Sequence, residues 1–239
     1  MSIITKLLRA REARKRGYHA GYPEDLWREL IARLVPGRTF VDVGCMWKVN
    51  GDYAFLAAAS GATSVTGVDI APATPDFIAR NAELGEPVRF LRGDLNDPNI
   101  EAWAGTFDVV FCSGVLYHVP NPVFSLHQLR RLCREVLILT SATMPERDVP
   151  NAAVLLPGLD DDERARLVYW TRYSKPGLDS AFERARGYAN WVWLPTPSCV
   201  RAMVELAGFT VSDFHPSRRV TTVVARPSEA PRWDALSAP

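Results

Sequence analysis

The stretch Thr39-Phe40-Val41-Asp42-Val43-Gly44 decides the fold of this chain. It is a short run of β-branched and aromatic residues that ends in an acid and a glycine, and this composition predicts a buried parallel strand followed by a sharp turn. Residues 51–59 predict a helix, and a second apolar run, residues 64–69, also ends in an acid. Strand, glycine turn, helix, strand and acid together are typical of a nucleoside-binding βαβ unit.

The length and the charge of the chain limit what it can be. Its 239 residues are enough for one large α/β domain with a small cap. The formal net charge of +1 argues against an extended nucleic-acid footprint. The basic stretch from Lys6 to Arg16 can still form a local contact patch, although such runs are usually the solvated face of a helix.

The cysteines and the apolar stretches bear on the cellular compartment. Cys45, Cys112, Cys133 and Cys199 have no metal-binding or redox spacing, so we expect buried, reduced thiols and no metal site. No apolar stretch is long enough to span a bilayer, and the N-terminal apolar residues precede the charges, the reverse of a secretory signal. We therefore expect a cytoplasmic protein without a membrane partner.

The alternation of strands and helices continues along the chain. Further strands are predicted at residues 87–92, 106–112, 135–140, 210–214 and 219–225, with helices near 76–84, 99–104, 119–133 and 197–207. An earlier helix begins at Pro23 and ends at Pro36-Gly37. The pattern predicts a single doubly wound α/β domain with one elaboration.

The turn after the first strand indicates which kind of nucleoside-containing ligand the chain binds. A dinucleotide-binding fold needs G-x-G-x-x-G to approach a pyrophosphate, and Met46 stands at the second glycine position. Asp69 suits the two hydroxyls of a ribose, and Asp94 with Leu95 suits an adenine edge. A ligand with a ribose and an adenine but no pyrophosphate is S-adenosylmethionine. Asp42, Asp69 and Asp94 end successive parallel strands, which indicates a ligand site rather than three unrelated loop caps.

These residues resemble the class I S-adenosylmethionine-dependent methyltransferases over about residues 39–225. The similar stretches are Val41–Cys45, Asp69, Gly93–Leu95, Phe107–Val110 followed by Ser113–His118, and Pro197–Phe209. The resemblance implies a Rossmann-like, seven-stranded, mostly parallel sheet whose last strand is antiparallel. It also implies that S-adenosylmethionine is bound by Asp42, Gly44, Cys45, Trp47, Asp69, Ile70, Asp94, Leu95, Ser113, Gly114 and Tyr117. Because Met46 replaces a glycine, we expect the methionine end of the cofactor beside Trp47.

The stretch Gly114-Val115-Leu116-Tyr117-His118 is also similar to the tRNA wobble-uridine carboxymethyltransferases. In that family the tyrosine of this motif contacts the cofactor, and the similarity implies the same role for Tyr117. Methyl transfer is an in-line displacement in which the protein mainly aligns the nucleophile. His118 is the candidate general base at the end of this strand, and the alternative is a histidine that only shapes the loop. Tyr117 is the second candidate catalytic residue, or a core ring.

The chain is expected to have five parts: a helical N-terminal segment (1–36), a cofactor-binding core (37–143), an inserted aromatic-rich cap (144–193), the C-terminal part of the core (194–225) and a flexible tail (226–239). The predicted substrate-binding residues of the cap are Tyr169, Trp170, Tyr173, Trp191 and Trp193. Flat rings suit a planar or apolar acceptor, and insertions in α/β enzymes are commonly functional. The alternative is that these rings only bury the insertion against the core.

Four functions compete at this point. The leading hypothesis is methyl transfer to an O, N or C atom of a small-molecule acceptor in specialised metabolism. The second is a tRNA-modifying methyltransferase or carboxymethyltransferase that contacts RNA through Lys6 to Arg16. The third is a non-catalytic module of the same fold, which the replacement at Met46 suggests. An NAD-binding oxidoreductase comes last, because the pyrophosphate motif is incomplete.

Overall fold

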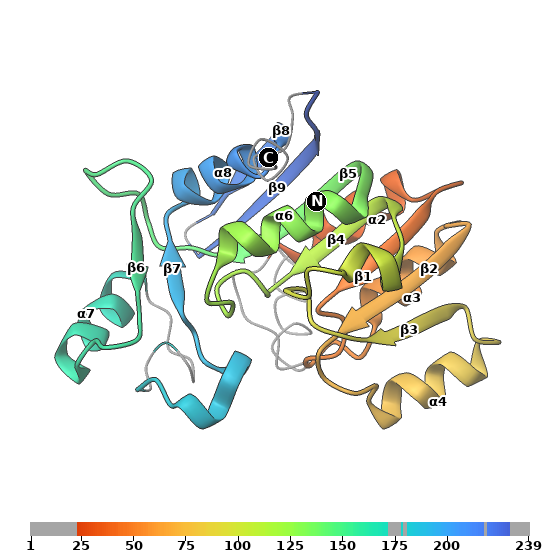
Figure 1. The fold of residues 1–239 in the computed structure, drawn as a ribbon, viewed down its shortest axis with the longest axis horizontal. Helices are drawn as coiled ribbons and strands as arrows, with labels where there is room; N and C mark the ends of the chain where they lie inside the picture. Colours follow the sequence, from red (N-terminus) through yellow and green to blue (C-terminus); the bar gives the residue numbers. More distant parts are fainter. Residues whose placement is uncertain (1–22, 172–177, 179–180, 218, 230–239) are drawn as a thin grey trace, which may run out of the picture.

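The computed structural model describes residues 23–171, 178, 181–217 and 219–229. Its centre is a seven-stranded sheet with the strand order β3-β2-β1-β4-β5-β9-β8 (Figure 1). The strands are β1 (Thr39–Val43), β2 (Ser64–Asp69), β3 (Val88–Arg92), β4 (Phe107–Ser113), β5 (Cys133–Ala142), β8 (Phe209–Pro216) and β9 (Val220–Pro227). β9 runs antiparallel to both β5 and β8, and the other neighbouring pairs are parallel. The predicted doubly wound sheet with a late antiparallel strand is therefore confirmed.

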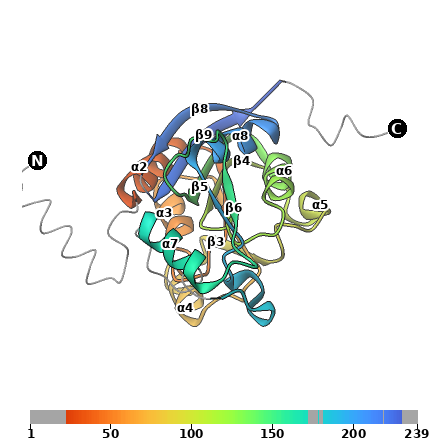
Figure 2. The same cartoon turned by 90° about the vertical axis from the view of Figure 1, so that its left-hand side faces the viewer.

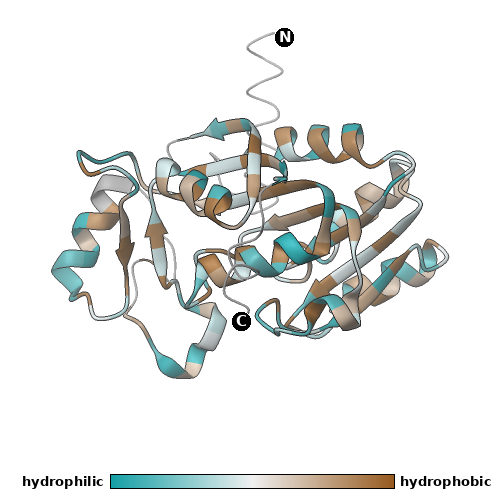
Figure 3. Ribbon diagram, turned by 45° about the horizontal axis from the view of Figure 1, so that its top comes forward, coloured by the Kyte–Doolittle hydropathy of each residue, from teal (hydrophilic) through white to brown (hydrophobic). Residues whose placement is uncertain are grey.

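Helices cover both faces of the sheet (Figure 2). One face carries α2 (Glu24–Leu34), α3 (Asp52–Ala59) and α4 (Pro75–Glu83), and the other carries α5 (Ile100–Ala104), α6 (Pro122–Leu132) and α8 (Pro197–Leu206). Each face is buried in an apolar cluster of its own. Figure 3 shows apolar strands at the centre and helices with polar outer faces, the pattern that burial of one helical face produces.

Three helices begin with the same local device, a polar cap followed by proline. The side chains of Thr74, Asn121 and Thr196 accept hydrogen bonds from backbone N–H groups of the first turns of α4, α6 and α8. In each case proline follows the cap, where its missing N–H costs nothing. These caps explain why the starts of the three helices can be predicted from sequence.

An inserted region stands apart from the main sheet, at the left of Figure 1. It contains β6 (Ala153–Leu155), α7 (Asp161–Thr171), the 3-10 helix η1 (Arg184–Ala189) and β7 (Trp193–Pro195), and β6 pairs with β7 in an antiparallel ribbon. An apolar cluster that includes Tyr117, Leu156 and Trp191 fastens it to the core. Sequence alone predicted no regular elements here, because no clear periodicity marks them.

Several smaller expectations concern single residues and the ends of the chain. All four cysteines are buried and free, as predicted. β9 ends at Pro227, one residue after the position at which the predicted tail begins. Residues 1–22, which include the basic stretch, and residues 230–239 lie outside the described part. Among the described helices, none is both long and apolar enough to cross a membrane.

Candidate cofactor and acceptor site

Gly44 makes the turn that directly follows the carboxyl end of β1. Its φ is +85°, which favours glycine, and a Cβ added there would lie 2.5 Å from Cγ2 of Val115. The loop after β4 therefore passes directly over the turn after β1. The strand order reverses between these two strands, and in open α/β sheets the crevice at such a reversal binds ligands.

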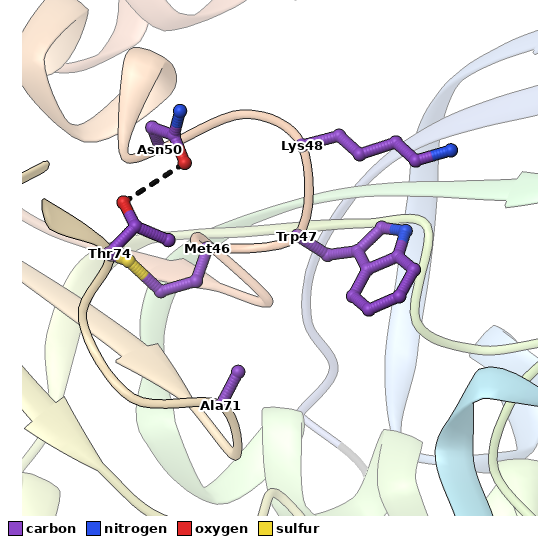
Figure 4. A pocket seen from close by; sticks show the side chains of 6 residues that line it. All are labelled: Met46, Trp47, Lys48, Asn50, Ala71 and Thr74. Atoms are coloured by element: carbon purple, nitrogen blue, oxygen red, sulfur yellow. Dashed lines mark hydrogen bonds between the residues drawn. The ribbon is translucent and has the colours of Figure 1, made fainter. Parts of the chain in front are cut away.

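The loop after Gly44 replaces the usual second glycine with a buried methionine. Met46 is 1% exposed, and its backbone N–H donates to Oδ2 of Asp69 over 2.7 Å. Trp47, by contrast, is 67% exposed. Together with the start of the loop after β2, this loop lines a cavity of about 310 Å³ (Figure 4), formed by Met46, Trp47, Lys48, Asn50, Ala71 and Thr74.

Asp69 is held by two backbone amides at the end of β2. Oδ2 accepts from Met46, and Oδ1 accepts from the N–H of Ala71 over 2.8 Å. Each oxygen keeps a second lone pair, so the carboxylate is oriented and still able to accept two ribose hydroxyls. The next residue, Ile70, is 46% exposed and offers an apolar surface beside it.

Asp42 is a buried acid with an unpaired oxygen. It is 1% exposed, and Oδ2 has no hydrogen-bond partner among the residues that the structure describes. Burial, with the negative charge of Asp69 nearby, raises the pKa of Asp42 to about 8, against the lowering effect of a hydrogen bond from the backbone of Ala54. An unpaired buried carboxylate is costly unless a donor satisfies it. The ammonium group at the methionine end of S-adenosylmethionine is such a donor, so this site fits that cofactor.

Asp94 lies after β3 and is contacted by the inserted region. Oδ1 accepts from the backbone N–H and from Nδ2 of Asn96, and Oδ2 accepts from the hydroxyl of Tyr188 over 2.8 Å. The side chain of Leu95, whose backbone N–H is predicted to lie at the adenine edge, is buried. Tyr188 was not among the predicted site residues. Only the density of aromatic residues in the cap pointed to it.

β4 ends at Ser113, and the loop after it carries Gly114 and Tyr117. The hydroxyl of Ser113 lies 2.8 Å from that of Thr140 on β5, and Gly114 has a φ of +74°. A Cβ added at Gly114 would lie 3.5 Å from the hydroxyl of Tyr117, so this buried tyrosine folds back toward the end of β4. Its backbone oxygen accepts from the N–H of Val192, which joins the loop to the cap.

His118 has one ring nitrogen already engaged. Nδ1 lies 2.7 Å from the backbone oxygen of Asn190. A carbonyl oxygen can only accept, so in the neutral ring Nδ1 carries the proton and Nε2 presents a lone pair. Burial lowers the pKa of His118 below its ordinary 6.5, against the opposite effect of this hydrogen bond. The ring is therefore neutral at pH 7, the form that a general base requires.

The structure places the predicted substrate-binding residues of the cap in different surroundings. Trp191 is 5% exposed with its ring centroid 4.4 Å from that of Tyr117, which is a packing position. Trp193 donates from Nε1 to the oxygen of Pro120 and borders a second, mostly apolar cavity of about 280 Å³. Tyr169 and Trp170 lie near the end of α7, where the backbone but not their side chains is described, and Tyr173 lies outside the described residues.

Cys45, a predicted cofactor-binding residue, lies directly after the turn at Gly44. It is fully buried, and a Cβ added at Gly67 would lie 2.8 Å from its sulfur. The thiol is therefore packed between β1 and β2, and burial raises its pKa well above the ordinary range. The backbone oxygen of Cys45 accepts from Gly51 and closes the loop. A cofactor role for Cys45 through its backbone stays a prediction.

Comparison with known protein families and curated sequences gives a consistent result. Residues 40–136 match a family model described as a methyltransferase domain. The tRNA U34 carboxymethyltransferase of Shewanella baltica strain OS155 is 32% identical over 219 residues, which are 87% of this chain and 54% of the relative. The enzyme of the same name from Actinobacillus succinogenes is 29% identical over 77% of this chain and 49% of its own. The chain thus spans about half the length of these relatives.

Solved structures share the fold at lower identity. Magnesium protoporphyrin IX methyltransferase from Synechocystis PCC 6803, solved with bound S-adenosylhomocysteine, aligns with a TM-score of 0.54 and 18% identity over 95% of this chain and 89% of its own. Coclaurine N-methyltransferase, solved with N-methylheliamine and S-adenosylhomocysteine, aligns with a TM-score of 0.57 and 18% identity over 80% of this chain and 49% of its own. These similarities concern the fold of the molecule.

Proposed function

We propose that this chain, a class I S-adenosylmethionine-dependent methyltransferase, transfers the one-carbon group of its cofactor to a tRNA nucleoside with His118 as the general base. The observation that carries the proposal is the contact between Nδ1 of His118 and the oxygen of Asn190, which leaves Nε2 as the basic atom of a neutral ring. Removal of a proton from the nucleophile is the task that this tautomer suits.

Four residues have distinct roles in holding the cofactor. Asp69 would accept the ribose hydroxyls through the lone pairs that Met46 and Ala71 leave available. The unpaired oxygen of Asp42 would accept from the ammonium group at the methionine end. Ile70 would cover one face of the adenine, and Asp94 would accept from its amino group. Bound S-adenosylmethionine supplies an electrophilic methyl group on a sulfonium and a neutral thioether as leaving group.

His118 and Tyr117 act on the acceptor side. Nε2 of His118 takes the proton of the attacking hydroxyl or amine as the new bond forms, and the neighbouring rings of Tyr117 and Trp191 hold the imidazole in place. Alignment of the nucleophile with the sulfonium contributes about 7–11 kcal/mol to lowering the barrier in reactions of this kind. Besides the cofactor site, catalysis by this chain therefore requires a positioned base and an acceptor site that aligns the nucleophile.

The acceptor is the part of the proposal that rests on the relatives. Sequence alone ranks a small molecule first, whereas the shared name of the curated relatives favours tRNA, with an alignment that reaches 87% of this chain. A small planar molecule is the second candidate. It is favoured by the mostly apolar cavity of about 280 Å³ beside Trp193.

The experiment incubates the protein with S-adenosylmethionine labelled in the methyl group and with bulk tRNA, with or without ribonuclease. The proposal expects ribonuclease-sensitive label in the acid-insoluble fraction, and mass spectrometry of the digested nucleosides identifies the modified base. His118→Asn should lose the transfer, and His215→Asn, a matched change at an exposed position on β8, should keep it. Label that appears only in organic extracts of small molecules contradicts tRNA as the acceptor.

A further inference from the structure

One short segment of the cap reaches two parts of the site. Tyr188, in η1, donates its hydroxyl proton to Oδ2 of Asp94 over 2.8 Å. Asn190, two residues later, presents its backbone oxygen to Nδ1 of His118 over 2.7 Å. The segment 183–190 therefore bridges the acid after β3 and the histidine after β4, which lie on opposite sides of β1 and β2 in the strand order.

Tyr188 belongs to a directed chain of hydrogen bonds. Ser125 of α6 donates to Oδ1 of Asn96 over 2.6 Å, and Nδ2 of Asn96 lies 3.2 Å from the hydroxyl of Tyr188 and 3.2 Å from Oδ1 of Asp94. Because an amide N–H and a hydroxyl donate while a carboxylate accepts, the direction is from Asn96 through Tyr188 to Asp94. Burial and the proximity of Asp94 raise the pKa of Tyr188, so its hydroxyl stays protonated.

The cap segment itself is held in shape by Asn190. The side chain of Asn190 is buried, donates to the oxygens of Glu183 and Gly187, and accepts from the N–H of Glu183. These bonds fix a small loop that presents Tyr188 to Asp94. A shift of Tyr188 by the length of one hydrogen bond would therefore also disturb the carbonyl that faces His118.

We propose that Tyr188 is a positioning residue that aims the carboxylate of Asp94 at the amino group of the adenine and so couples the cap to cofactor binding. The inference rests on the proposed function, because it assumes that Asp94 faces the adenine. Oδ2 of Asp94 accepts one proton from Tyr188 and keeps a second lone pair for the amino group. Without the hydroxyl, the bonds from Asn96 still hold Oδ1, but Oδ2 loses the donor that fixes its direction.

A purely structural role for Tyr188 makes a different prediction. If the hydroxyl only fastened the cap, its loss would weaken every ligand equally or would lower the melting temperature alone. A positioning role changes the preference for adenine itself. The readout is therefore the ratio of affinities for S-adenosylhomocysteine and S-inosylhomocysteine, in which an oxygen replaces the amino group of the adenine.

The experiment measures both affinities by calorimetry for the wild type, Tyr188→Phe, Asp94→Asn and Phe182→Ala. The last variant removes an exposed ring from the same part of the cap and serves as the control. We expect Tyr188→Phe to weaken S-adenosylhomocysteine binding about tenfold, the size of one ordinary hydrogen bond, with little change for the inosine analogue. Phe182→Ala should behave as the wild type.

A second measurement, limited proteolysis, reports on the cap and does not depend on enzyme activity. Trypsin can cut after the exposed Arg184 and Arg186 of η1, and bound S-adenosylhomocysteine should slow these cuts in the wild type but much less in Tyr188→Phe. The inference is overturned if Tyr188→Phe keeps the wild-type affinity ratio and the wild-type protection while Asp94→Asn loses the ratio. If the wild type does not bind S-adenosylhomocysteine, the proposed function fails, and the inference fails with it.

Discussion

Nδ1 of His118 lies 2.7 Å from the backbone oxygen of Asn190, a residue 72 positions later in the chain. This contact joins the loop after β4 to the cap and determines which ring nitrogen can act as a base. It also places His118 beside Tyr117 and Trp191, with ring centroids 4.3 and 6.1 Å away. His118, which the sequence predicts as a site residue, is thus oriented by Asn190, which the sequence does not predict as one.

The first prediction concerns the pH dependence of transfer. The pKa of His118 is lowered from 6.5, so the basic form persists to more acidic pH than for a free histidine. The rate constant kcat should be flat from pH 7 to 8 and should fall only below about pH 6.5. His118→Gln should lower kcat by about 10²- to 10⁴-fold and leave the Kd of S-adenosylmethionine within twofold. If kcat of the variant stays within threefold of the wild-type value, His118 is not the general base.

The second prediction concerns Asp69. Its carboxylate accepts from Met46 and Ala71 and is available to the ribose, so its removal affects both stability and binding. Asp69→Ala should weaken S-adenosylmethionine binding by about ten- to a hundredfold, since hydrogen bonds to a charged group are worth about 1.5–3 kcal/mol. Calorimetric titration measures the change, and Glu83→Ala, at an exposed position of α4, is the control. Equal affinities for the two variants would contradict the assignment.

The third prediction concerns the buried acid Asp42. Its pKa in the folded chain, about 8, lies above the ordinary value of 3.8 for an aspartate, so its protonated form is favoured by folding. Its contribution to stability is therefore fully present below pH 3.8 and is lost as the pH rises through 8. Urea unfolding of the cofactor-free protein between pH 5 and 8.5 should show falling stability, and Asp42→Asn should flatten that dependence.

The same acid predicts a proton change on cofactor binding. An ammonium group at Oδ2 stabilises the carboxylate, so binding at pH 7 should release a proton from Asp42. The binding enthalpy of S-adenosylhomocysteine should then vary among buffers with different ionisation enthalpies, and the variation should decrease in Asp42→Asn. A binding enthalpy that is independent of the buffer in the wild type would refute this role.

The fourth prediction separates two reasons for glycine at position 44. Gly44 has a positive φ and no space for a Cβ beside Val115, whereas Gly85 has a φ of +77° with nothing within 4 Å of an added Cβ. Gly85→Ala should cost about 1–2 kcal/mol of unfolding free energy from backbone strain alone. Gly44→Ala should cost more, and Val115→Ala in the same chain should restore part of the difference. Equal costs at the two positions would show that the contact with Val115 is unimportant.

Much of the cofactor side was predictable because its signals are local. The acids Asp42, Asp69 and Asp94 follow or end apolar runs, and parallel strands bring their carboxyl ends to one edge of the sheet. Proline after a polar cap marks the starts of α4, α6 and α8. Periodicity and turn chemistry depend on neighbouring residues, so they can be interpreted without knowledge of the fold.

The sequence by itself therefore determined the doubly wound sheet, the class of cofactor and the loops in which the predicted cofactor-binding residues lie. Only the tertiary structure decided how the cap meets that site: that Tyr188 reaches Asp94, that Asn190 faces His118, and that Trp191 is buried against Tyr117. These contacts join residues 72 to 94 positions apart. They depend on the packing of an insertion that has no regular periodicity, and long-range packing leaves no signal in the local pattern of one chain.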